Sequence, residues 1–89
     1  MDWNTKIEMV KALNNGNYEQ AVSIFSQDED WDSQAIDMFI TGFNLSEYRL
    51  LEPLKERILN TDSEYLPLRA ALRWETIREA FKGNIKFKK

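Results

Sequence analysis

The chain contains neither cysteine nor histidine among its 89 residues. These two residue types supply the thiol nucleophile, the commonest general base and the usual ligands of transition metals. Their absence excludes catalysis of those kinds and leaves the core without a disulfide. We therefore expect a protein that is not an enzyme and that uses no cofactor and no metal ion.

Glycine and long apolar runs are scarce as well. A phosphate-binding loop needs clustered glycines, whereas Gly16, Gly42 and Gly83 are isolated at the expected ends of helices. No stretch approaches the roughly twenty apolar residues of a membrane span, and the N-terminus, with Asp2, lacks the apolar segment of a signal peptide. We expect neither nucleotide hydrolysis nor membrane insertion, and the cytoplasm is the expected location.

The chain does have the composition of a globular protein, with 43% hydrophobic and 30% charged residues. Its length gives room for one modest core, and its apolar residues recur at three- and four-residue intervals. The predicted fold class is all-α: a compact bundle of four to five short helices in an antiparallel helical-hairpin arrangement. Residues 1–84 are the predicted single helical domain, and residues 85–89 are a short basic C-terminal tail.

The last helix, expected at residues 66–82, is the longest uninterrupted periodic segment. The apolar residues that it is expected to bury share one helix face: Leu66, Ala70, Trp74, Ile77 and Phe81. The residues expected to face water occupy the other positions: Arg69, Arg73, Arg78 and Glu79. The remaining helices are expected to pack around this segment, at residues 5–14, 18–26, 33–43 and 46–60.

Three of those helices carry further signals. Thr5 and Glu8 have the spacing of a capping box at the start of the first helix. The third helix is apolar around most of its circumference, so we expect it to be central and to contact the last helix directly. Pro53 removes a backbone donor within residues 46–60, which favours two short helices with Pro53 opening the second. The apolar stripe expected to bury the first helix is Trp3, Ile7, Val10 and Leu13.

Four residues around the first turn resemble the turn and second helix of a tetratricopeptide repeat: Gly16, Tyr18, Ala21 and Phe25. The resemblance covers ten residues and implies an antiparallel helical hairpin. The family's upstream tryptophan, leucine and small-residue positions hold different residues here: Thr5, Glu8 and Met9. No second copy follows at the 34-residue period, so we predict a generic hairpin outside that family.

An acidic run with a tryptophan inside it follows the second helix, at residues 28–32. Its alternating aspartates are typical of the start of a calcium loop, but Ser33 and Phe39 occupy the positions that need glycine and glutamate. No metal site is therefore predicted. Two interpretations remain: Asp32 caps the next helix while Trp31 folds back on the core, or the loop docks onto a basic protein surface.

Charge is divided unevenly along the chain, with −6 in residues 1–45 and +3 in residues 46–89. The two halves could simply attract each other within one fold. The basic residues near the C-terminus could also contact the phosphates of a nucleic acid, or stabilise the negative end of the last helix dipole.

The sequence favours a non-enzymatic protein–protein interaction module, which would be a small inhibitor, adaptor or assembly factor. Such a chain would also suit a phage-encoded protein that acts on a host complex. The predicted partner-binding residues are Asp28, Asp30, Trp31, Asp32, Arg69, Arg73 and Arg78. The expected partner is another protein, or a second copy in a homo-oligomer. The alternative is a small nucleic-acid-binding protein that uses the basic C-terminal helix and tail.

Overall fold

The computed structural model describes residues 1–84, which form helices and no strand. In chain order the elements are α1 (Trp3–Asn14), α2 (Tyr18–Gln27), α3 (Ser33–Gly42), the 3₁₀ helix η1 (Leu45–Leu54), α4 (Lys55–Leu59) and α5 (Leu68–Phe81). The predicted all-α class is confirmed. The predicted basic tail, residues 85–89, lies outside the described residues.

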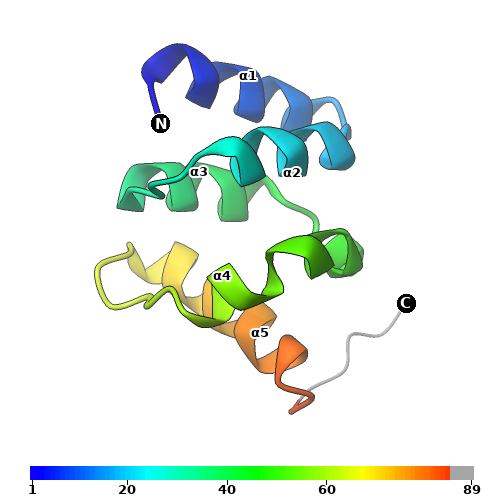
Figure 1. Cartoon of the computed structure of the whole chain (residues 1–89), viewed down its shortest axis with the longest axis vertical. Helices are drawn as coiled ribbons and strands as arrows, with labels where there is room; N and C mark the ends of the chain where they lie inside the picture. The colour runs from blue at the N-terminus through cyan, green and yellow to red at the C-terminus, as the bar shows by residue number, and fades with distance from the viewer. Residues whose placement is uncertain (85–89) are drawn as a thin grey trace.

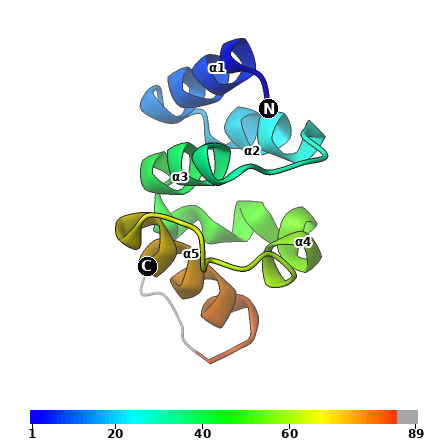
Figure 2. The ribbon, with the colours of Figure 1, turned by 90° about the vertical axis from the view of Figure 1, so that its left-hand side faces the viewer.

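The helices form two layers. One layer holds α1, α3 and α5, and α3 lies in the middle, in contact with both of the others. The second layer holds α2, η1 and α4, which lie to one side of the first layer in Figure 2. The predicted central position of the third helix, and its direct contact with the last one, are confirmed.

The core lies between the two layers. Phe25 of α2 stacks on Phe39 of α3 with ring centroids 4.1 Å apart, and it meets the edge of Trp74 of α5 at 6.4 Å. Trp74 is fully buried, and its indole nitrogen donates to the Thr61 carbonyl at 3.1 Å. The predicted core stripe of the last helix is confirmed at Ala70, Trp74 and Ile77, which are all fully buried.

The predicted buried stripe of α1 is confirmed at Leu13, is only partly buried at Ile7 and Val10, and is wrong at Trp3. Its buried side chains are Met9, Ala12, Leu13 and Lys6, whereas Trp3 is 59% exposed. The helix also begins earlier than expected, because the Asp2 carboxylate accepts from the Thr5 backbone at 2.8 Å and so caps the helix in place of Thr5.

Burial of Lys6 explains the rotation of α1. The Lys6 ammonium donates to Asp32 Oδ2 at 3.0 Å and to Gln34 Oε1 at 2.7 Å, both at the start of α3. A buried ammonium is tolerated only with such partners, and its apolar stem covers core surface. The result is that α1 turns a lysine inward and a tryptophan outward.

Gly16 lies in the turn after α1, at the helix end where the sequence predicts it. Gly16 has φ +76°, its backbone nitrogen donates to Leu13, and the Asn17 nitrogen donates to Ala12. These two bonds satisfy the last carbonyls of the helix and reverse the chain into α2. The predicted antiparallel hairpin of the first two helices follows from this turn.

Two further helix boundaries differ from prediction. The segment at 46–60 does divide in two, but its first part is the 3₁₀ helix η1, which contains Pro53, and α4 begins at Lys55. Pro53 therefore lies inside η1 and does not open the second helix as predicted. The last helix begins at Leu68, directly after Pro67, and not at Leu66.

Candidate functional site

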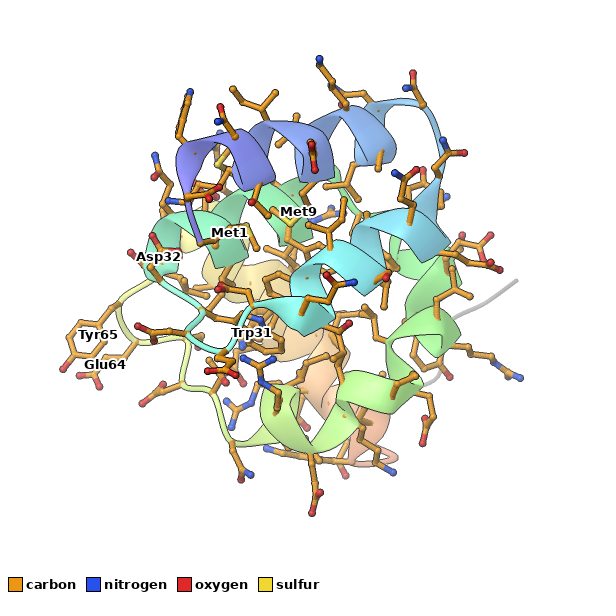
Figure 3. The ribbon with its side chains drawn as sticks, turned by 45° about the horizontal axis from the view of Figure 1, so that its top comes forward. Met1, Met9, Trp31, Asp32, Glu64 and Tyr65 are labelled. Atoms are coloured by element: carbon orange, nitrogen blue, oxygen red, sulfur yellow. The ribbon has the colours of Figure 1, made fainter. Side chains whose placement is uncertain are left out.

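Trp31 of the acidic loop folds back on the core, as one of the two interpretations predicts. Its ring stacks on Phe25 at 4.1 Å, meets the edge of Trp74 at 5.9 Å, and its indole nitrogen donates to the Phe25 carbonyl at 2.9 Å. Figure 3 shows Trp31 in the middle of the fold, close to these helices. The side chain is partly buried and has its polar atom satisfied, so it serves the packing of this loop.

Arg57 of α4 covers the outer side of the same tryptophan. Its guanidinium carbon lies 3.8 Å from the Trp31 ring centroid, and its nitrogens donate to the carbonyls of Ser26 and Glu29. A guanidinium over an indole is attracted by the ring quadrupole. Trp31 is thus held between Phe25 on one side and Arg57 on the other.

The three aspartates of the acidic loop have different surroundings. Asp28 Oδ1 lies 3.4 Å from the Met1 amino nitrogen, and Asp30 is exposed. Asp32 caps α3 by accepting from the Ala35 backbone at 3.3 Å, which confirms the predicted cap. Burial raises the pKa of Asp32, but the hydrogen bond and charge of Lys6 outweigh it, so the net pKa is lower than usual.

The three arginines of α5 do not form one water-facing surface, so that prediction is wrong for two of them. Arg73 turns inward: its Nε donates to the Ile40 carbonyl at 2.9 Å and its terminal nitrogen donates to the Phe43 carbonyl at 2.5 Å. These carbonyls lie at the end of α3, where a helix has no backbone donors left. Arg73 therefore caps α3 from the neighbouring helix.

Arg78 has an equivalent role at the end of α4. It donates to the Leu59 carbonyl at 3.0 Å and forms an ion pair with Glu75, and its side chain is 18% exposed. A hydrogen bond from Ser63 lowers the pKa of Glu75, burial opposes this shift, and the charges of Arg78 and Lys82 reinforce it. Arg78 is held in place from both sides.

Arg69 alone among the predicted arginines points into solvent. Its side chain is 74% exposed and lies 3.6 Å from the Asp37 carboxylate of α3. An exposed pair of this kind contributes little to stability. Arg69 is therefore the one member of this group whose charge is available to a partner.

The structure does not bring the predicted loop residues, at positions 28–32, together with the predicted arginines of α5. Trp31 contacts Trp74 of α5, but no ion pair within residues 1–84 joins the loop aspartates to Arg69, Arg73 or Arg78. The attraction between the oppositely charged halves instead takes the form of separate local pairs, such as Asp37 with Arg69.

Four large hydrophobic residues are exposed to solvent, which the sequence did not predict. The exposed fractions are 59% for Trp3, 83% for Tyr65, 75% for Leu68 and 62% for Leu72. All four belong to the layer of α1, α3 and α5 or to the turn that leads into it. Figure 3 shows Tyr65 pointing away from the body of the fold, with Glu64 beside it. We call this set the outer apolar face.

A signal for this face was present in the sequence. Leu68 and Leu72 are one turn apart and lie opposite Ala70 and Trp74 on a helical projection. A helix with apolar residues on two opposite sides has more than one surface to cover. The signal was hidden because the longer stripe through Trp74 was sufficient to explain α5.

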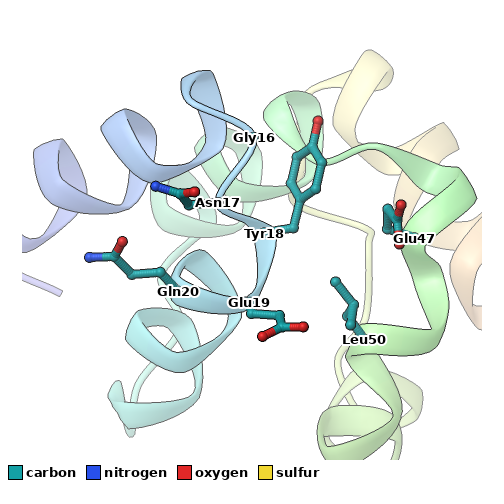
Figure 4. Close-up of a pocket in the computed structure, with 7 residues that line it drawn as sticks. All are labelled: Gly16, Asn17, Tyr18, Glu19, Gln20, Glu47 and Leu50. Atoms are coloured by element: carbon teal, nitrogen blue, oxygen red, sulfur yellow. The ribbon is translucent and has the colours of Figure 1, made fainter.

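A groove of about 570 Å³ lies between the start of α2 and η1, within the second helical layer (Figure 4). Tyr18 and Leu50 line it together with the carboxylates of Glu19 and Glu47. It contains none of the seven predicted residues, and its ionisable lining residues are Tyr18, Glu19 and Glu47. The lining of this groove is acidic and polar.

Metal and membrane sites can be checked over residues 1–84. No group of three or more aspartates or glutamates in that range is arranged to hold a metal ion. None of the helices formed by those residues has the length and hydrophobicity needed to cross a bilayer.

The described residues therefore define an all-α protein of two helical layers, with four exposed hydrophobic residues on one layer and an acidic groove on the other. Comparisons with protein-family models, curated proteins and solved structures give no match to this chain.

Proposed function

We propose that this protein is a non-enzymatic protein–protein interaction module, of the inhibitor, adaptor or assembly-factor type. The observation that supports the proposal best is the outer apolar face, with four large side chains each more than half exposed. Three of the four lie within eight residues, Tyr65 to Leu72, so they are not scattered singly over the surface. Concentrated exposed apolar surface is typical of protein contact sites.

The role of arginines in the fold also bears on this proposal. Arg57, Arg73 and Arg78 each donate to backbone carbonyls, so their guanidinium groups are occupied inside the molecule. A nucleic-acid site needs cations that are free to bind phosphates. Among the described residues, α5 and the residue that follows it contribute Arg69 and Lys82 as exposed cations, and each of these has a carboxylate partner. A protein partner accords better with this arrangement.

The proposal is tested by capture from a lysate with the immobilised chain. We expect a defined protein to be retained by the wild type and lost with Leu68→Glu. The matched control is Gln20→Glu, which adds the same charge at an exposed position on the acidic side and should leave capture unchanged. Equal capture by the wild type and Leu68→Glu would remove the outer apolar face as the contact site.

A further inference from the structure

The turn that ends α1 contains an asparagine followed by a glycine, Asn15 and Gly16, and both residues are exposed. Such a pair is chemically labile, because glycine has no side chain to keep its backbone nitrogen away from the side-chain amide of the preceding asparagine. Asparagine is one of the residue types that limit the lifetime of proteins at high temperature. The conformation of the turn decides whether the two groups can react.

The folded turn holds the two reacting atoms apart. Cyclisation requires the Cβ of Asn15 to eclipse the Gly16 nitrogen about the Cα–C bond, so that the side-chain carbon Cγ comes within reach of that nitrogen. At the observed ψ of 2°, the backbone nitrogen of Asn15 occupies the eclipsed position instead. Because the substituents of Cα are spread around this bond, the Cβ is rotated away by roughly a third of a turn.

Two hydrogen bonds fix this conformation. The Gly16 nitrogen donates to the Leu13 carbonyl at 3.1 Å, and the Asn17 nitrogen donates to the Ala12 carbonyl at 2.8 Å. Rotation of Asn15 toward the reactive geometry moves Gly16 and Asn17 with it and breaks both bonds. The first bond also occupies the N–H group whose nitrogen has to attack. The reaction therefore requires the end of α1 to open locally.

We propose that Asn15 is a site of spontaneous deamidation, at a rate set by local opening of the turn between α1 and α2. In the opened turn the Gly16 nitrogen gives its proton to water and bonds to Asn15 Cγ. The bond from Cγ to Nδ2 then breaks, and ammonia leaves with that proton. Water opens the cyclic imide at one of its two carbonyls, which gives aspartate or isoaspartate. This chemistry needs only water and does not depend on the proposed interaction.

The two products differ in their effect on the turn. Aspartate keeps the main chain at its normal length and adds a negative charge at the C-terminal end of α1, where the helix dipole is also negative. Isoaspartate inserts the Cβ atom into the main chain, which displaces Gly16 and Asn17 from the carbonyls that they bond. Formation of isoaspartate should therefore loosen the hairpin of α1 and α2 without cleavage of the chain.

Incubation of the full chain at neutral pH and physiological temperature, with and without denaturing urea, tests the inference. Cleavage after glutamate releases residues 9–19, in which mass spectrometry locates each converted asparagine. We expect Asn15 to convert at least about tenfold faster in urea than in the folded chain. Asn14 and Asn17, which no glycine follows, are internal controls and should convert far more slowly. Equal rates with and without urea, or an Asn15 as inert as these neighbours in urea, overturn the proposal.

Substitutions at Asn17 test whether the turn controls the rate. Asn17→Pro removes the N–H that donates to Ala12 and leaves Asn15 and Gly16 in place. The matched control is Asn17→Ala, which keeps that N–H and loses no side-chain cap, because the Asn17 side chain makes none. In the folded chain Asn15 should convert several-fold faster in Asn17→Pro than in Asn17→Ala, whereas in urea the two rates should agree.

Equal rates for the two Asn17 variants in the folded chain would overturn control by the turn. Circular dichroism checks that both variants fold, and the wild-type comparison with and without urea decides the question if Asn17→Pro does not.

The melting temperatures of the separated products test the structural consequence. The isoaspartate form should melt below the Asn15→Asp variant, which carries the same added charge on a main chain of normal length. Equal melting temperatures would show that the turn tolerates the longer main chain, and would overturn the predicted loosening of the hairpin.

Discussion

The side of α5 that faces α3 and α4 carries two arginines, whereas the side that faces solvent carries two leucines. Arg73 and Arg78 reach past the core to backbone carbonyls at the ends of neighbouring helices. Leu68 and Leu72 have no covering element among residues 1–84. The comparison teaches that residue type alone does not decide which side of a helix is buried. Unpaired carbonyls at helix ends need hydrogen-bond donors, so an arginine can turn inward to reach them as an apolar side chain turns inward to reach the core.

The strongest test of this difference between buried arginines and exposed leucines uses two adjacent residues, Arg73 and Leu72. Arg73→Ala removes both donors to the end of α3 and should lower the free energy of unfolding by about 2–4 kcal/mol. Leu72→Ala, at a position that is 62% exposed, should change it by less than about 0.5 kcal/mol. Urea denaturation of each variant measures both changes. Equal losses for the two variants would contradict the comparison.

Two tryptophans extend the same comparison beyond α5. Trp31→Ala removes the stack on Phe25 and an indole hydrogen bond, and should lower the free energy of unfolding by about 2–3 kcal/mol. Trp3→Ala, at 59% exposure, should lower it by less than about 1 kcal/mol. Thermal unfolding followed by far-ultraviolet circular dichroism distinguishes them. A larger loss for Trp3 would mean that α1 is oriented as its sequence suggests.

The smallest expected effect concerns acid. The folded-state pKa values of Asp32 and Glu75 are lowered, so their contribution to stability is present at neutral pH and is lost as pH falls through those lowered values. Each contribution should be under about 1 kcal/mol, because both side chains are more than a third exposed. Melting curves from pH 7 to pH 2 should show a shallower acid dependence for Asp32→Asn than for the wild type. An unchanged slope would argue against the Lys6–Asp32 contact.

The helices of this protein were predictable because their signals are local. The periodic apolar residues of α5 and the asparagine–glycine turn at Gly16 depend on neighbours within a few positions. The orientation of α1 could not be predicted from local signals. Lys6 faces inward because it donates hydrogen bonds to Asp32 and Gln34, which lie 26 and 28 residues later in the chain, and Trp3 faces outward.

The site residues show the same limit. The cap by Asp32 could be predicted from the sequence because its acceptor contact is three residues away. The inward turn of Arg73 could not, because its carbonyl partners lie 30 and 33 residues earlier in the chain. Nothing in the local pattern distinguishes a capping arginine from an exposed one such as Arg69.

The arginine caps also determine how the molecule should come apart. Helical hairpins stacked in sequence often unfold piece by piece, because each unit contacts only its neighbours. Here the ends of α2 and α3 are completed by Arg57 and Arg73, which are supplied about thirty residues later in the chain. A fragment that stops short of α5 would leave the end of α3 to fray. We expect the full chain to unfold in one cooperative transition, and C-terminal truncation products that lack α5 to be poorly helical on their own.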